Sequence, residues 1–184
     1  MKTSLPTLDD VLDFWFREIP ESAWWEKNPA FDRQLQQRFG ALYAAARQGE
    51  LYGWRRDIHG RLAEVIVLDQ FARNFFRDSG QAFAGDSMAL VLAQEAVATG
   101  EALELPPHQR AFLYMPYMHS ESLAIHEQAL LLFAEPGLEF NLDFEKRHKA
   151  IIDRFGRYPH RNAVLGREST PEELAFLQTP GSSF

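Results

Sequence analysis

DIHGRLAEVIVLDQFARNFF, residues 57 to 76, is the stretch from which the fold can be inferred. Asp57 can cap a helix, and the apolar residues after it lie on more than one side of that helix, namely Leu62, Val65, Ile66, Leu68 and Phe71. A helix that is apolar around so much of its circumference packs against others on both sides. The stretch therefore predicts a central helix that runs to about Phe76.

The end of this predicted helix is polar. Asp69, Gln70, Arg73 and Asn74 fall among its apolar residues, and each is costly to bury unless it finds a partner. Asp69 and Arg73 are four residues apart, as are Gln70 and Asn74, so each pair lies on one helical face. These four side chains are candidate ligand-binding residues.

Capping signals and helical spacing predict the other helices. They are expected at about residues 7–18, 29–49, 86–100, 141–155 and 170–177, with a further helical region that Pro116 kinks or divides. Trp24 and Trp25 are expected to pack in the core or between helices. No run alternates apolar and polar residues as a strand would. The prediction is an all-α fold of about seven to nine helices, as a bundle or a tetratricopeptide-like array.

Composition limits the class of protein. The chain of 184 residues is expected to form one domain over residues 1–184, and 13% aromatic residues predict a well-filled core. With no cysteine there is no disulfide and no thiolate nucleophile. No signal peptide or membrane span is recognised, so a cytoplasmic protein is expected. The net charge of -7 argues against duplex nucleic acid as a partner.

Positive charge is concentrated between Lys146 and Arg167. This stretch holds seven Lys/Arg and one acid, Asp153, in a chain with 19 Lys/Arg and 26 Asp/Glu. The sequence Asp-x-Phe-x-Arg occurs at 69–73 and again at 153–157. Two equivalent helix ends would bring together one set of side chains, which are Arg73, Asn74, Arg157, Arg161 and Asn162. Such positive charge binds an anion, pairs with carboxylates of the same chain, or lies solvated at the surface.

Histidines supply the candidate catalytic groups. His119, His148 and His160 can act as bases, and Glu121 can orient one of them, while Ser120 is a further ligand-binding candidate. His119 and His126 are seven residues apart, so they are expected on one helical face. That spacing does not fit a helical metal pair, and neither a metal nor a cofactor is expected.

Five blocks occur in order along the chain: LDQFARNFFR, AFAGDSMAL, FLYMPYMHSE, FGRYPHRNAVLGR and ESTPEELAFL. With them the chain resembles the bacterial family called domain of unknown function 924. The resemblance implies an all-helical, tetratricopeptide-like, soluble protein of the bacterial cytoplasm with no established activity. It carries over these motif positions: Asp69, Gln70, Arg73, Asn74, His119, Ser120, Glu121, His148, Arg157, His160, Arg161 and Asn162. The tetratricopeptide signature itself is absent.

Three functions are compatible with these residues. The first is a site for a small anionic ligand, because Arg offers paired donors to phosphate or carboxylate. The second is a helical scaffold for a partner protein, in which the polar residues only hold helices together. The third is an enzyme with a His/Glu acid–base pair, although no nucleophile motif or phosphate loop is present. The sequence does not indicate an oligomeric state.

Overall fold

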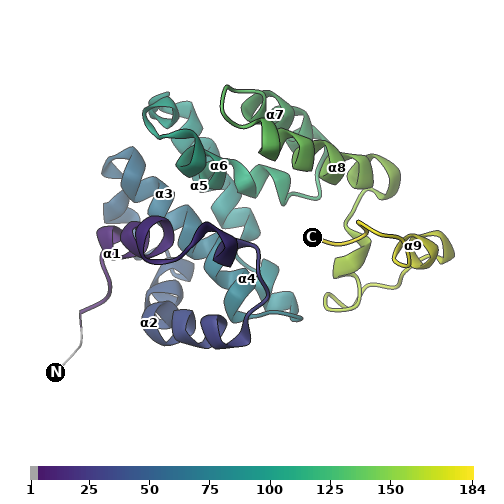
Figure 1. Ribbon diagram of the computed structural model, residues 1–184, viewed down its shortest axis with the longest axis horizontal. Helices are drawn as coiled ribbons and strands as arrows, with labels where there is room; N and C mark the ends of the chain where they lie inside the picture. The colour runs from purple at the N-terminus through teal and green to yellow at the C-terminus, as the bar shows by residue number, and fades with distance from the viewer. Residues whose placement is uncertain (1–3) are drawn as a thin grey trace.

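The computed structural model describes residues 4–184, and within this range it contains helices and no β-strand (Figure 1). The predicted all-α class is confirmed. The α-helices are α1 (Leu8–Asp13), α2 (Pro29–Arg47), α3 (Ile58–Ile66), α4 (Ala72–Phe75), α5 (Asp86–Ala98), α6 (Pro107–Met118), α7 (Leu123–Phe133), α8 (Glu139–Phe155) and α9 (Pro171–Phe176). Short 3-10 helices lie between them: η2 (Glu21–Trp24), η3 (Tyr52–Arg56), η5 (Gly80–Phe83), η6 (Glu101–Glu104) and η7 (Pro159–Arg161).

The central helix exists as predicted. α3 and α4 form one continuous helix through the π-helical turn η4 (Val67–Phe71), and every residue from 62 to 72 is buried. α1, α5 and α6 pack against α3, while α2 packs against η4 and α4. A π-turn inserts one extra residue into the helix and redirects the side chains around it. Asp69 and Gln70 both lie in this turn.

Local signals fixed the helix starts correctly. The side chain of Thr7 caps α1 and that of Thr170 caps α9, each in a complete capping box. Asn28 caps α2, with Pro29 in its first turn, and Asp57 caps α3. These polar side chains satisfy backbone N–H groups that a helix start leaves unpaired.

Several expectations were wrong. Pro116 does not divide its helix, since α6 continues past it to Met118. His119 is the residue after α6 whereas His126 lies in α7, so the two do not share a helical face. Trp25 was expected in the core or between helices, but it is 58% exposed.

The C-terminal part packs around a second, smaller core. Ile151, Ile152 and Tyr158 are buried there, with Phe155 and Phe176 against them. The hydroxyl of Tyr158 donates to the carbonyl oxygen of Met118 at 2.6 Å, which joins this core to the end of α6. In Figure 1 the segment with α9 lies at the end of the molecule away from α1 and α2. No helix between residues 4 and 184 is long and apolar enough to cross a membrane.

Candidate functional site

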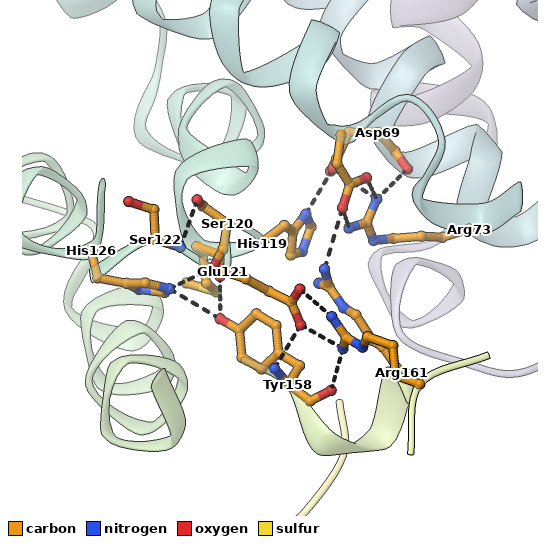
Figure 2. Close-up of polar contacts among 12 residues, drawn as sticks. Asp69, Arg73, His119, Ser120, Glu121, Ser122, His126, Tyr158 and Arg161 are labelled. Atoms are coloured by element: carbon orange, nitrogen blue, oxygen red, sulfur yellow. Dashed lines mark hydrogen bonds and ion pairs between the residues drawn. The ribbon is translucent and has the colours of Figure 1, made fainter. Parts of the chain in front are cut away.

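Asp69 is the centre of a buried polar cluster. Its carboxylate accepts hydrogen bonds from Arg73 Nη1 at 2.9 Å and Gln70 Nε2 at 2.6 Å, and it lies 2.7 Å from His119 Nδ1 (Figure 2). Burial by itself would raise the pKa of Asp69, but the Arg73 guanidinium and His119 outweigh it and lower the pKa to about 2. Asp69 is therefore ionised at neutral pH, and the predicted Asp69–Arg73 pair is confirmed.

His119 lies at the end of α6, with its side chain 15% exposed. Burial and the charge of Arg73 lower its pKa, although Asp69 acts in the opposite direction. The ring is therefore neutral at pH 7. Its single proton is on Nδ1, which donates a hydrogen bond to the Asp69 carboxylate. Nε2 then carries the lone pair, and it makes no hydrogen bond with any residue that the structure describes.

Arg73 is shared between two carboxylates. Besides Asp69 it binds both oxygens of Asp86, each at 3.0 Å. Asp86 is the first residue of α5, and Gly85 before it explains this position: a Cβ at Gly85 would lie 2.6 Å from the carbonyl oxygen of Leu68. The absence of a side chain lets the start of α5 approach the π-turn, which brings Asp86 to Arg73.

Arg161 is the poorly paired cation of the cluster. Its side chain is 8% exposed, and its guanidinium carbon lies 4.4 Å from the ring centroid of Phe83 and 4.5 Å from that of Tyr158. Within residues 4–184 its one ion pair is with Asp86 at 3.5 Å, and its buried Nε has no hydrogen-bond partner there. Burial and the nearby charge of Arg73 lower the pKa of Arg161. In Figure 2 it extends from the η7 segment toward Asp69 and Arg73.

Glu121 does not orient a histidine. Its carboxylate accepts two hydrogen bonds from Arg167, at 2.7 and 2.9 Å, and one from the backbone N–H of Tyr158 at 2.7 Å. Figure 2 shows Glu121 between Tyr158 and Arg161. Asp69 instead takes the orienting position beside His119. The expected role of Glu121 is therefore corrected, because chain proximity to His119 did not predict which way its side chain would turn.

A second histidine–carboxylate pair lies deeper. His126 Nδ1 is 2.6 Å from Glu145, and Nε2 is 2.8 Å from the carbonyl oxygen of Ser120. Both His126 and Glu145 are fully buried, and burial raises the pKa of Glu145 although His126 opposes it. Glu145 was not among the site residues predicted from the sequence. The one feature of the sequence that could have indicated it is the position of this acid among the apolar residues of α8, four residues before Lys149.

The remaining candidates fall outside the cluster. Arg157 pairs with Glu173, and Asn162 donates to Ser169 and Glu173, so neither converges on Asp69. Asn74 donates to Asp32. Ser120 accepts from the N–H of Ser122. Asp153 pairs with Lys149, which shows that the two Asp-x-Phe-x-Arg segments are not equivalent.

Two other histidines, one buried and one partly buried, are neutral at pH 7. Burial lowers the pKa of His148 to about 3, and its ring stacks on Phe184 with centroids 3.7 Å apart. Burial and Arg161 lower the pKa of His160 to about 4, and its Nδ1 is buried without a partner. Neither ring contacts Asp69, so the structure places them beside the cluster rather than in it.

The cluster is compact and close to neutral. Asp69 and Asp86 balance Arg73 and Arg161 when His119 is uncharged. Two surface hollows, of about 350 and 150 Å³, lie at the N-terminal helices and beside α6, and no residue of the cluster lines either. The cluster is thus a largely buried polar network, in which Arg73, Asp86 and His119 keep 15–20% of their side-chain surface exposed. It offers a donor-rich arginine, a neutral imidazole with a free lone pair, and a buried carboxylate that fixes that imidazole.

The helical fold and this polar cluster define the class of protein as all-α. The chain belongs to the family described as "Bacterial protein of unknown function (DUF924)", which it matches over residues 11–181. It is similar to a solved structure of a protein of unknown function from Agrobacterium tumefaciens, with 37% sequence identity and a TM-score of 0.88. That similarity covers 93% of this chain and 96% of the other. The curated proteins gave no match.

Proposed function

We propose that this protein binds a small anionic group, such as a phosphate or a carboxylate, at Arg161. The observation that carries the proposal is the incomplete pairing of this guanidinium. It is held flat between Phe83 and Tyr158, has one long contact to Asp86, and keeps a buried Nε without a partner. A buried charge with so few hydrogen bonds costs free energy that an anion would recover.

Arg161 itself favours an anion over a neutral ligand, because its buried guanidinium is incompletely paired. Arg73 adds a second positive charge, and neutral His119 has a hydrogen-bond acceptor at Nε2 for a protonated oxygen. Arg73 is already bound to the Asp69 carboxylate and to both oxygens of Asp86, so its charge is offset and it offers no free donor. The ligand is therefore small, and Arg161 provides its main direct contact.

Thermal unfolding tests this proposal. Sodium phosphate, sulfate and acetate are compared with sodium chloride at equal ionic strength, because a ligand that binds the folded state raises the melting temperature. We expect at least one of these anions to raise it by about 2–4 °C in the wild type. Arg161→Gln should abolish the rise, while Arg154→Gln, at an exposed arginine paired with Glu172, should leave it intact.

Anion effects no larger than that of chloride would overturn the proposal. In that outcome Arg161 and its neighbours only hold helices together. The chain is then better described as a helical scaffold for a partner protein, which is the alternative that the sequence left open.

The Asp69–His119 pair favours a second candidate, an enzyme in which His119 removes a proton. A buried, ionised carboxylate bound to Nδ1 fixes the tautomer that presents a basic Nε2, as in catalytic dyads. Nitrogen-15 NMR of the imidazole tests this arrangement. Nε2 should be unprotonated at pH 7, and Asp69→Asn should shift the ring toward the other tautomer. A protonated Nε2 in the wild type would contradict the role.

A further inference from the structure

An aromatic hollow lies beside α6, and no residue of the polar cluster lines it. Its volume is about 150 Å³, and its walls come from η2, from α6 and from the start of α8. Four aromatic side chains dominate the lining, namely Trp24, Trp25, Phe112 and Phe140. Three separate segments of the chain thus bring their aromatic rings to one place on the surface.

The rings form a preorganised corner. Trp25 and Phe112 are nearly parallel, with an interplanar angle of 13° and centroids 6.1 Å apart. Trp24 is perpendicular to Trp25 at 90° and close to perpendicular to Phe112 at 77°. The indole N–H of Trp24 donates to the carbonyl oxygen of Trp15 at 2.9 Å, which fixes this ring in place. A ligand would therefore find walls that are already set at right angles.

Two of the rings are exposed to solvent, although burying an aromatic ring would stabilise the fold. Trp25 is 58% exposed and Phe140 is 66% exposed, whereas Phe112 beneath them is 2% exposed. Exposed aromatic rings around a hollow are typical of a binding surface rather than of a core. The hollow is similar in size to an apolar cavity of about 150 Å³ that holds one benzene molecule. It therefore fits a single compact group.

The charge of the lining indicates the sign of that group. Glu21 lies in the lining, and none of the lining residues is Lys or Arg. Aromatic faces attract cations, Trp most strongly, and the protein as a whole carries a net charge of -7. A primary ammonium keeps a tight hydration shell, whereas a methylated ammonium presents apolar methyl groups to the rings. We propose that this aromatic hollow binds a quaternary methylammonium group.

Such a group can come from a free small molecule or from a trimethylated lysine of a protein. Choline, a trimethyllysine peptide and the same peptide with unmodified lysine distinguish these sources. The neutral alcohol 3,3-dimethylbutan-1-ol has the shape of choline without its charge. Titration of each at constant ionic strength, followed through the indole N–H signal of Trp25 in NMR spectra and through Trp fluorescence, measures the affinity.

We expect saturable binding of choline with a dissociation constant of about 1 mM or below, and about tenfold weaker binding of the neutral alcohol. Phe140→Ala should weaken choline binding about fivefold or more, and Glu21→Gln about threefold. Trp25→Ala, followed by fluorescence, should act like Phe140→Ala. Tyr52→Ala, which removes an equally exposed aromatic ring elsewhere, should change nothing.

Tighter binding of the trimethyllysine peptide than of choline would assign the site to a protein partner, and the reverse would assign it to a small molecule. Equal affinity for choline and the neutral alcohol would overturn the proposal, because the hollow would then bind by apolar contact alone. No saturation with any of the cations up to about 100 mM would overturn it as well.

Discussion

Asp69 joins two side chains from different parts of the chain to one buried carboxylate. Its substitution by Ala leaves Arg73 with Asp86 as its one carboxylate among the described residues and leaves Nδ1 of His119 without its acceptor. Breaking a buried ion pair by removing one partner costs about 3–5 kcal/mol, so Asp69→Ala should lower the free energy of unfolding by that amount. Urea denaturation measures it, and a loss below about 1 kcal/mol would show that the pair is not structurally important.

Arg157 tests whether the second Asp-x-Phe-x-Arg segment is structural. Its guanidinium binds both oxygens of Glu173, a carboxylate with 3% exposure that also completes the capping box of α9. Arg157→Ala should therefore lower the melting temperature, because it leaves a buried carboxylate short of partners. Any effect of phosphate on the melting temperature should persist in this variant. Loss of that effect would place Arg157 in the anion site after all.

Phe71 in the central helix is buried more deeply than Phe155 at the end of α8. Phe71 is fully buried in η4 between Trp15 and Phe39, so Phe71→Ala should cost about 3–5 kcal/mol. Phe155 is half-buried and packs on Phe176, so Phe155→Ala should cost less, about 1–2 kcal/mol. Parallel urea titrations compare the two. Equal losses would mean that the smaller C-terminal core is packed as tightly as the main one.

The start of α5 depends on a missing side chain. A Cβ at position 85 would lie 2.6 Å from the carbonyl oxygen of Leu68. Because that oxygen belongs to the backbone, the clash is relieved only if α5 moves away from the π-turn. Gly85→Ala should cost about 1–3 kcal/mol and should also weaken the Arg73–Asp86 pair. NMR shifts at Arg73 together with a lower urea midpoint would establish both effects. Gly53→Ala, at a glycine with open space around it, serves as the control.

At the scale of the whole molecule, stability should depend on pH through buried histidines. The pKa is lowered to about 3 for His148 and to about 4 for His160, and it is also lowered for His119. In the unfolded chain these histidines bind protons near pH 6.5, whereas in the folded chain they do so only at lower pH. Their contribution to stability is therefore fully present above about pH 6.5 and falls as the pH drops toward about 4. The raised pKa of Glu145 acts in the opposite direction.

Urea midpoints measured between about pH 7.5 and 4.5 test this dependence, and the loss should be on the order of a few kcal/mol. His148→Phe should reduce the slope, because phenylalanine can occupy the same apolar place without taking up a proton. His59→Gln, at an exposed histidine, should leave the slope unchanged. Stability that stays constant over this range would mean that these histidines take up protons at the same pH in the folded and unfolded chains.

The sequence by itself determined the elements of this protein. Capping residues such as Thr7 and Thr170 act within one helical turn, and the apolar circumference of residues 57–76 required a central helix whatever its neighbours were. The Asp69–Arg73 pair was predictable for the same reason, since its spacing along one helix fixes the distance. A tetratricopeptide-like arrangement stays a prediction.

Only the tertiary structure decided which polar groups meet. His119 and Asp69 are 50 residues apart in the chain, and nothing local selects Asp69 over Glu121 as its partner. The repeated Asp-x-Phe-x-Arg pattern suggested a convergence that Glu173 prevents, because Arg157 pairs with it instead. The exposure of Trp25 was equally invisible, since the sequence shows that a ring is apolar but not whether another element covers it. Partner choice depends on how helices pack, and packing is a property of the whole chain.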